Sequence, residues 1–323
     1  MPRIVTLLTL LLLAVGFNPV AAQTAWPTKP VKFFVAGAPG SAPDIVGRLI
    51  AAKLAETWGQ PTIIDNRAGG AGNLGTQAAV LAGPDGGHNL LFGQAAPMAM
   101  NQYLFKEMPF DVEKDFLPIV SLGISPMMIA VNADVPAKTL PELIALAKAQ
   151  PGKLSFGTSS SKNIPHLTGE MLANMAGIKL LHVPYRAGTQ AAQETISGLT
   201  QIYVDGVPPM SGHRASGRLR VLAVSSARRL PNFPDIPAVA ETLPGFEMNG
   251  WFAVMAMVGT PPGVIARVNR DINAVVKDKD IAERLLGFGM YEPGGTPEQL
   301  AAFLASERKN YAKAVGVAGI TPE

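Results

Sequence analysis

Two short segments carry the residue types that bind anions most readily. The first, residues 36–44, follows an apolar run and leads through a glycine/proline turn into a segment with helical periodicity. The second, residues 157–164, contains one threonine, three serines and an asparagine, and it also lies between an apolar run and a helical segment. The first turn of a helix has N–H groups without a partner and about half a positive charge. Each segment, called here the first loop and the second loop, therefore predicts half of a site for a small anion.

In the first loop we expect backbone N–H groups to bind the anion. The predicted donors are Ala38, Gly40 and Ser41, and Gly40 permits the positive φ that such a turn needs. Asp44 is a further candidate binding residue. The alternative for Asp44 is a structural role, in which its carboxylate caps the backbone N–H groups of the helix.

In the second loop the candidates are mainly hydroxyl groups, those of Thr158, Ser159, Ser160 and Ser161. Each neutral hydrogen bond from such a group contributes about 0.5–1.5 kcal/mol net. The alternative is a flexible serine-rich loop without a ligand. His166, one turn into the following helix, is either a ligand residue or a structural histidine.

Polar residues also follow two other apolar runs. Tyr185 ends the segment LHVPY, and Asp205 ends QIYVD. In α/β sheets, ligands bind at the carboxyl ends of strands. Asp205 could accept a hydrogen bond from a ligand hydroxyl or ammonium group, or it could hold a loop in an Asx-turn. Trp251 and Phe252 could line the same cleft or fill the core.

The sequence contains no pattern for a metal, a cofactor or a catalytic nucleophile. None of the four histidines has a second histidine or a carboxylate at metal-ligand spacing. The segment GTSSS at residues 157–161 lacks the last glycine of a nucleophile elbow. Residues 70–75 match GxGxxG, but Gln94 stands where an acidic residue should meet a ribose. We interpret residues 70–75 as a turn that lets two backbones approach closely, with a share in lining the cleft as the alternative.

The elements that must position these residues alternate between strand and helix. Strands are expected at 31–37, 61–65, 88–93, 117–122, 126–132, 154–157, 179–183, 201–205, 219–225 and 248–257. Helices are expected at 42–57, 73–82, 139–149, 164–176, 188–197, 261–277, 279–287 and 296–316. Three of the helices begin with a capping-box pattern: Ser41 with Asp44, Thr139 with Glu142, and Thr296 with Gln299. This alternation predicts an α/β fold with mostly parallel sheets.

Two apolar stretches, near 117–131 and 246–257, are uninterrupted enough to cross between two lobes. The sequence thus predicts a first lobe of residues 24–124 plus 248–323 and a second lobe of residues 125–247. Two crossing strands form a hinge, and a cleft between hinged lobes favours a small ligand.

The first 22 residues have the features of a signal peptide. Arg3 is followed by an apolar run and by small residues suited to cleavage. The chain has no cysteine, which excludes a lipid anchor on cysteine and a disulfide scaffold. Its formal net charge is only +3 and falls to +2 without Arg3, and no cluster of Lys and Arg is present. Nucleic acids and membrane surfaces are therefore poor candidate partners, and we expect a monomer in the periplasm.

Taken together, several segments resemble one family along the whole mature chain. They are WPTKPVKFFVAGAPGSAPDIVGRLIAAKL, GQPTIIDNRAGGAGNLG, PDGGHNLLFG, HVPYRAG, GRLRVLAVSSARR and GGTPEQLAAF. The chain resembles the extracytoplasmic solute receptors of tripartite tricarboxylate transporters, the Bug family. The resemblance implies a two-lobed periplasmic-binding-protein fold of type II-like architecture without enzymatic activity. It also implies a small carboxylate as solute (a di- or tricarboxylate, an amino acid or an aromatic acid) and a membrane permease as partner.

The resemblance also places individual residues. The family's PGG followed by Asp corresponds to Pro39, Gly40, Ser41 and Asp44, with serine in place of a glycine. Its VPYKG corresponds to residues 183–187, where Ala187 replaces the glycine and leaves the size of the ligand at that edge open. Where the family has small hydroxyl residues, this chain has Gln94 followed by apolar residues, which implies a more apolar wall with a bulkier amide.

Two other functions remain open at this point. An exported hydrolase would use Ser159 or Ser160 as nucleophile with His166, and a sensor would present its solute to a membrane signalling protein. Under the receptor hypothesis the donors are backbone amides, which do not titrate, so binding should change little between about pH 6 and 8.

Overall fold

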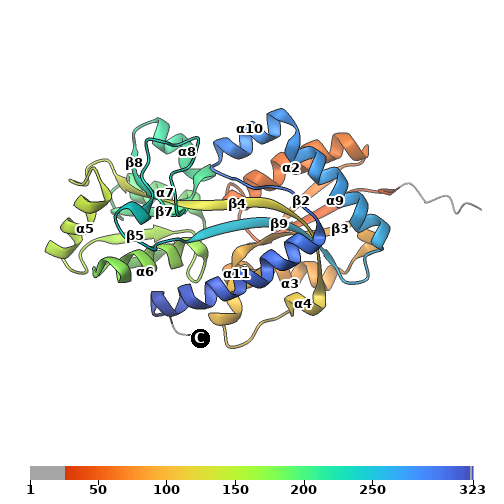
Figure 1. The fold of residues 1–323 in the computed structure, drawn as a ribbon, viewed down its shortest axis with the longest axis horizontal. Coiled ribbons are helices and arrows are strands. Elements are labelled where there is room, and N and C mark those ends of the chain that lie inside the picture. Colours follow the sequence, from red (N-terminus) through yellow and green to blue (C-terminus); the bar gives the residue numbers. More distant parts are fainter. Residues whose placement is uncertain (1–25, 321, 323) are drawn as a thin grey trace, which may run out of the picture.

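The computed structural model describes residues 26–320 and residue 322. The expected signal peptide lies outside the described residues. As the sequence predicts, strands and helices alternate along the chain and build an α/β molecule (Figure 1). The strands are β1 (Val31–Val35), β2 (Thr62–Asn66), β3 (Asn89–Gln94), β4 (Phe116–Asn132), β5 (Ser155–Thr158), β6 (Leu181–Pro184), β7 (Ile202–Gly206), β8 (Leu219–Val224) and β9 (Asn249–Met257).

The helices follow the predicted ranges to within about two residues, with two additions. They are α2 (Ala42–Trp58), α3 (Asn73–Ala82), α4 (Val112–Asp115), α5 (Leu140–Ala149), α6 (Ile164–Ala176), α7 (Gly188–Ile196), α8 (Val207–Ala215), α9 (Pro262–Lys277), α10 (Lys279–Gly287) and α11 (Pro297–Ala318). Helices α4 and α8 were not predicted. Short turns of other helix types are η1 (Gly70–Gly72), η2 (Asp85–Gly87), η3 (Ala96–Met100), η4 (Asn101–Tyr103) and η5 (Val239–Glu241).

The strands form two sheets that share β4. The order is β2-β1-β3-β9-β4-β7-β5-β6, and β8 also pairs with β4. The first sheet contains β1, β2, β3, β9 and the first part of β4; the second contains the rest of β4 with β5 to β8. The outer pairs are parallel, as predicted. The prediction of mostly parallel pairing is wrong at the centre, because β9 and β4 run antiparallel to their neighbours.

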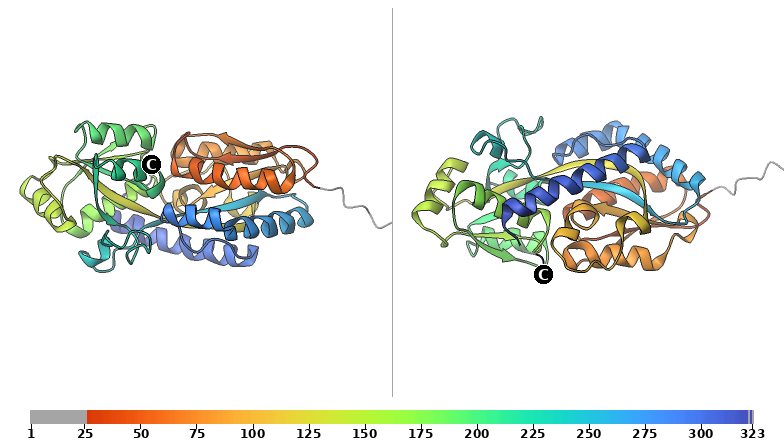
Figure 2. Two further views of the ribbon diagram at one scale, coloured as in Figure 1. Left: turned by 90° about the horizontal axis from the view of Figure 1, so that it is seen from above. Right: turned by 60° about the horizontal axis from the view of Figure 1, so that its bottom comes forward.

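The long strand β4 replaces two expected strands, 117–122 and 126–132. It is continuous from Phe116 to Asn132. The break expected between the two strands is not present, and the pairing of β4 with β9 instead has register shifts at 118–120 and 121–123. One of these lies at Gly123, whose φ of 111° is accessible mainly to glycine. Figure 1 shows β4 and β9 passing side by side through the middle of the molecule. Figure 2 shows the green segments around 150–200 and the orange segments around 40–100 at opposite ends.

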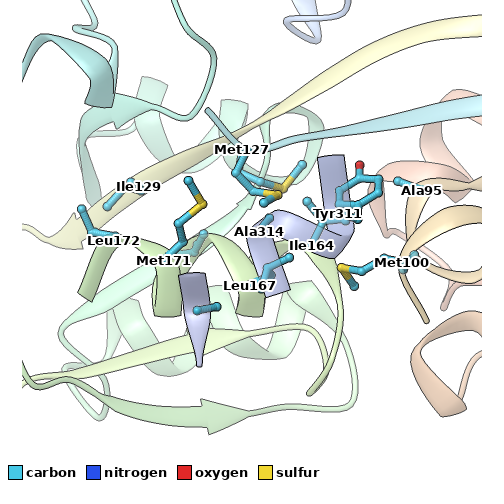
Figure 3. Packing of buried hydrophobic residues seen from close by; sticks show 14 of the residues in the cluster. Ala95, Met100, Met127, Ile129, Ile164, Leu167, Met171, Leu172, Tyr311 and Ala314 are labelled. Carbon is cyan, nitrogen blue, oxygen red and sulfur yellow. The ribbon is translucent and has the colours of Figure 1, made fainter. Parts of the chain in front are cut away.

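A large apolar cluster joins the two ends on one side of the crossing strands. Helix α11 packs against α6, β4 and η3. Figure 3 shows side chains from all four elements in one buried cluster; they include Met100, Met127, Ile164, Leu167 and Tyr311, each at most 7% exposed. Burial of side chains of this size contributes about 1.5–3 kcal/mol each. Helix α11 therefore packs on the crossing strand β4 and also contacts α6 beside the second sheet and η3 beside the first.

The three predicted capping boxes have different outcomes. At α11 the box is complete, because the Thr296 side chain accepts from the Gln299 N–H and Gln299 returns a bond to the Thr296 N–H. At α5, Thr139 caps as predicted, but Glu142 binds the N–H of Lys138 instead. At α2 the prediction is wrong: the Ser41 side chain makes no cap bond to the helix.

Candidate functional site

A cavity of about 430 Å³ lies where the two sheets meet, at the carboxyl ends of their strands. The residues directly after β1, β5 and β6 line it, as do the last residues of β3 and β7. Both loops contribute to its wall, so the structure brings together the two segments that the sequence singles out. This is the position at which α/β sheets bind ligands.

The structure divides the predicted binding residues into two groups. Those that line the cavity are Ala38, Ser41, Gln94, Ser159, Ser160, Tyr185, Ala187 and Asp205. Those that do not line it are Gly40, Asp44, Thr158, Ser161 and His166. The second group acts on the shape of the loops, as the hydrogen bonds below show.

The first loop is closed by its own hydrogen bonds. The Gly40 N–H donates to Asp44 Oδ2 at 2.8 Å, and the Ser41 N–H donates to the Ala38 carbonyl at 3.1 Å. The Ser41 hydroxyl donates to the same carbonyl at 2.6 Å. The prediction of free N–H groups at Gly40 and Ser41 is therefore wrong. Among the described residues, the N–H groups of Ala38 and Ala42 have no such partner, and both residues line the cavity.

Asp44 has a structural role, although its carboxylate binds the N–H of Gly40 in the turn before α2 and not the N–H groups of the helix. Its second oxygen, Oδ1, forms an ion pair with Arg48 Nε at 2.9 Å. Asp44 is 4% exposed and is absent from the cavity wall. Its carboxylate thus holds the turn around Gly40, where φ is 78°, in place for the residues that do face the cavity.

The second loop is held from beneath by a histidine pair. The Thr158 hydroxyl donates to the Ser160 carbonyl and accepts from His182 Nε2, both at 2.7 Å. The rings of His166 and His182 stack with centroids 3.9 Å apart. Burial, and then the proximity of the His166 ring, lower the pKa of His182 to about 3, so its imidazole is neutral.

The other end of the second loop is bound to His166, which explains why that residue is not in the cavity. Its Nδ1 accepts from the Lys162 N–H at 3.0 Å, and its Nε2 lies 3.4 Å from a Glu170 oxygen. Asn163 caps α6 and also donates to Ser159 Oγ at 3.0 Å. The positions of Ser159 and Ser160 in the cavity wall are therefore set by the hydrogen bonds of Thr158, Asn163 and His166.

We predict that replacement of Thr158 by valine lowers the free energy of unfolding by about 1–2 kcal/mol, because His182 Nε2 and the Ser160 carbonyl then lose a buried partner. The shape of the side chain is kept, so packing changes little. Urea denaturation of the wild type and of Thr158→Val measures the difference. A change below a few tenths of a kcal/mol would show that these two bonds do not hold the loop.

The wall opposite the first loop contains a buried carboxyl group. Asp205 is 7% exposed, and it accepts from the Tyr203 hydroxyl at 2.8 Å and from the Gly206 N–H at 2.7 Å. Burial raises the pKa of Asp205 to about 6, although the hydrogen bonds from Tyr203 and Gly206 oppose the shift. Gly188 is required here, since a Cβ at that position would lie 2.3 Å from Asp205 Oδ2.

Helix α8 is the main element of the site that the sequence analysis missed. It begins directly after Gly206, which lines the cavity, and a Cβ at Gly206 would lie only 3.3 Å from Ala42 Cβ at the start of α2. Its start is marked by Pro208 and Pro209, a pattern that is favourable in a first helical turn and could have indicated it. First-turn residues of α2, α6 and α7 line this cavity, as does Gly206 at the N-cap of α8, and four helix starts together make it attractive to an anion.

The remaining wall is apolar and includes the glycine-rich turn after β2. Residues 68–72 line the cavity in part, together with Trp251 and Phe252. Trp251 is 1% exposed and donates through Nε1 to Glu307 of α11 at 3.1 Å. A Cβ at Gly75 would lie 2.6 Å from both Ala36 Cα and the Arg67 carbonyl oxygen. The interpretation of residues 70–75 as a close backbone approach is confirmed, and the turn lines the cleft as well.

The geometry does not support the hydrolase alternative. Both His166 ring nitrogens face groups other than Ser159 and Ser160, whose hydroxyls bond to Asn163 and to the Ser161 carbonyl. Within residues 26–320, no group of three or more His, Asp or Glu side chains could hold a metal ion. No helix in this range is long and apolar enough to cross a membrane.

Comparisons with known proteins agree with this architecture. The family model for the “Tripartite tricarboxylate transporter family receptor” matches residues 46–318. Protein BugT of Bordetella pertussis is 32% identical over 321 residues, which cover 99% of this chain and 98% of BugT. The structure of R. palustris Rpa4515 with adipate has a TM-score of 0.89 and 29% identity, and covers 92% of this chain and 100% of its own. That of periplasmic binding protein BugD has a TM-score of 0.86 and 27% identity, with 92% and 100% coverage.

The fold and the cavity between its two sheets are those of a periplasmic binding protein. The chain belongs to the receptor family of tripartite tricarboxylate transporters. Because this is a family of solute-binding receptors, the predictions of the family, of the α/β binding-protein fold and of a non-enzymatic role are confirmed.

Proposed function

We propose that this receptor captures a small organic carboxylate in the periplasm and delivers it to a membrane permease of the tripartite tricarboxylate type. The observation that carries the proposal is the convergence of four helix starts on one cavity. The adipate bound by the similar Rpa4515 is a carboxylate of this class.

The charges around the cavity favour neutral donors as the main contacts. The charged side chains that line it, among the described residues, are Arg186, which is exposed, and Asp205. A carboxylate would accept hydrogen bonds from the Ala38 and Ala42 N–H groups on one side and from the Ser159 hydroxyl on the other, since the Ser160 hydroxyl already donates to the Ser161 carbonyl. Arg186 would then attract the anion from the solvent side.

Closure of two lobes would complete the binding site. The lobes would comprise residues 24–124 plus 248–323 and residues 125–247, with β4 and β9 as the hinge. The contact of α11 with α6 limits the motion on one side, so opening would occur on the side of α2 and α8. The solute would stabilise the closed form only through its higher affinity for that form.

A thermal-shift screen tests the proposed function. Dicarboxylates, amino acids and aromatic acids are added at millimolar concentration to protein that has been unfolded and refolded, which removes any co-purified ligand. At least one carboxylate should raise the melting temperature, because a ligand that binds only the folded state stabilises it. If none does, the proposed carboxylate specificity is wrong.

We further predict that phenylalanine at position 41 blocks the first loop. Ser41 lines the cavity, so Ser41→Phe should raise the Kd of any carboxylate found in the screen by about tenfold or more, which corresponds to about 1.4 kcal/mol. Isothermal titration calorimetry measures this change. Ser306→Phe, on the exposed surface of α11, is the matched control and should leave Kd unchanged. Equal Kd values for Ser41→Phe and the wild type would place the solute away from the first loop.

A further inference from the structure

Two polar side chains on the floor of the cavity each have a buried atom without a hydrogen-bond partner among the described residues. Ser125 is 1% exposed, and its hydroxyl is buried without a hydrogen bond to any described residue. Gln94 is partly buried as a residue, but its Nε2 is buried and has no hydrogen bond to any described residue. Both residues line the cavity. Since an unsatisfied buried donor is destabilising, such groups in a binding cavity point to acceptors on the solute.

The register of the crossing strands puts both side chains on one face. Gln94 lies opposite Phe252, and Ser125 lies opposite Gly250, in antiparallel pairs on either side of β9. Residues directly opposite each other share a face, and residues 250 and 252 share a face because side chains alternate along a strand. Two strand spacings and an offset of two residues along the strand separate the backbones of Gln94 and Ser125, which together amount to about 12 Å. The two unpaired groups therefore mark two ends of the same floor.

The surroundings of the two groups differ. A Cβ at Gly206 would lie 3.9 Å from Ser125 Oγ and 3.3 Å from Ala42 Cβ, so Ser125 lies where α2 and α8 both begin. Gln94 is followed by Ala95 and Ala96, which line the apolar wall. The Ser125 end thus suits an anionic carboxylate, and the Gln94 end suits an oxygen that is carried on an apolar chain.

We propose that Gln94 and Ser125 are the specificity-determining residues of this receptor and that its solute has two oxygen-bearing ends. Ser125 donates to a carboxylate held between the starts of α2 and α8. Gln94 donates to a second carboxylate or carbonyl oxygen at the far end. This inference rests on the proposed function, and it selects among carboxylates: a monocarboxylate with an apolar tail leaves the Gln94 amide unpaired.

The position of Ser125 also connects recognition to both sheets. Ser125 pairs with Gly250 in the first sheet, and two residues later Met127 pairs with Gly206 in the second. The backbone at Met127 is also held in place, because the Met127 N–H donates a hydrogen bond to Ser225 Oγ at 2.8 Å. A solute bonded to Ser125 therefore contacts the strand at the point where it changes partners.

The test compares straight-chain dicarboxylates, from succinate to suberate, with the monocarboxylates of the same lengths. Calorimetric Kd values are measured for the wild type, Gln94→Leu and Ser125→Ala. The wild type should prefer the best dicarboxylate over its monocarboxylate partner by about tenfold or more. Gln94→Leu should remove most of that preference by weakening only the dicarboxylate. Ser125→Ala should weaken both acids by similar factors.

Two further variants keep the test decisive. Gln193→Leu, on the exposed side of α7, controls for the loss of an amide and should retain the preference. Gln94→Glu keeps the size of the side chain and should reject the dicarboxylate more strongly than Gln94→Leu does, through charge repulsion. An unchanged preference in both Gln94 variants, or none in the wild type, overturns the inference while carboxylate binding itself stands. Absence of any carboxylate binding to the wild type overturns the proposed function as well.

Discussion

Replacement of Gly75 by alanine is expected to lower the free energy of unfolding by about 3 kcal/mol and to weaken solute binding at the same time. The added Cβ would lie 2.6 Å from Ala36 Cα and 2.6 Å from the Arg67 carbonyl oxygen. Both are backbone atoms, so α3 and the end of β1 must separate, and overpacking of this kind destabilises by about 1–3 kcal/mol or more. Ala36 begins the first loop, so the displacement reaches the cavity directly. Urea denaturation and calorimetric titration measure the two effects.

Gly316→Ala is the matched control for this substitution. Gly316 lies inside α11, and a Cβ there would have no neighbour within 4 Å. Alanine should stabilise that helix by up to about 1 kcal/mol, because it has the higher helix propensity. If Gly75→Ala were as stable as the wild type, the two backbones would not be packed as closely as the structure has them, and the role assigned to residues 70–75 would be wrong.

Most of the fold could be predicted because local pattern and tertiary role agree. The buried parallel strands read as short apolar runs, and the helices between them have clear periodicity and caps, as at α11. Helix α8 was missed because its nine residues, VPPMSGHRA, combine two prolines with polar residues and show no apolar stripe. The antiparallel centre was missed because pairing direction depends on where distant strands return, which no local pattern encodes.

The site could be predicted to the level of loops but not of side chains. Strand ends followed by helix starts located the cavity correctly. The direction of each hydroxyl depends on partners far along the chain: Thr158 turns inward because His182 lies beneath it. Ser125 was missed because a single serine in an apolar strand has no sequence signature. Only its position between Gly250 and Gly206 makes it part of the cavity floor.

The structure also revises the expected pH dependence. Backbone amides do not titrate, but the buried Asp205 beside them does, with a pKa raised by burial to about 6. Its carboxylate accepts from the Tyr203 hydroxyl and from the Gly206 N–H, and among the described residues the other charged side chain on the cavity wall is the exposed Arg186. An anionic solute should therefore bind more tightly when Asp205 is protonated. Its Kd should rise as pH increases from about 5 to 7 and change little above that range.

Asp205→Asn should accordingly gain stability relative to the wild type as pH increases. In the unfolded chain this carboxyl has its ordinary pKa of 3.8, and in the folded protein the value is about 6. Between these values the folded state binds more protons than the unfolded state, so the stability contributed by the wild-type carboxyl falls as pH rises through this window. The loss over the full window is about 3 kcal/mol at about 1.36 kcal/mol per pKa unit. Asparagine does not titrate and should show no such loss.

Urea denaturation of both proteins at pH 4, 5.5 and 7 measures this difference in the free energy of unfolding. His182, whose lowered pKa makes stability rise with pH over a similar window, is present in both proteins and cancels in the comparison. A difference between Asp205→Asn and the wild type that grows with pH indicates a carboxylate that ionises in the cavity wall without a cation to balance it. A difference that stays constant from pH 4 to 7 would mean that Asp205 titrates normally, and the expected rise of Kd for an anionic solute above pH 5 would fail with it.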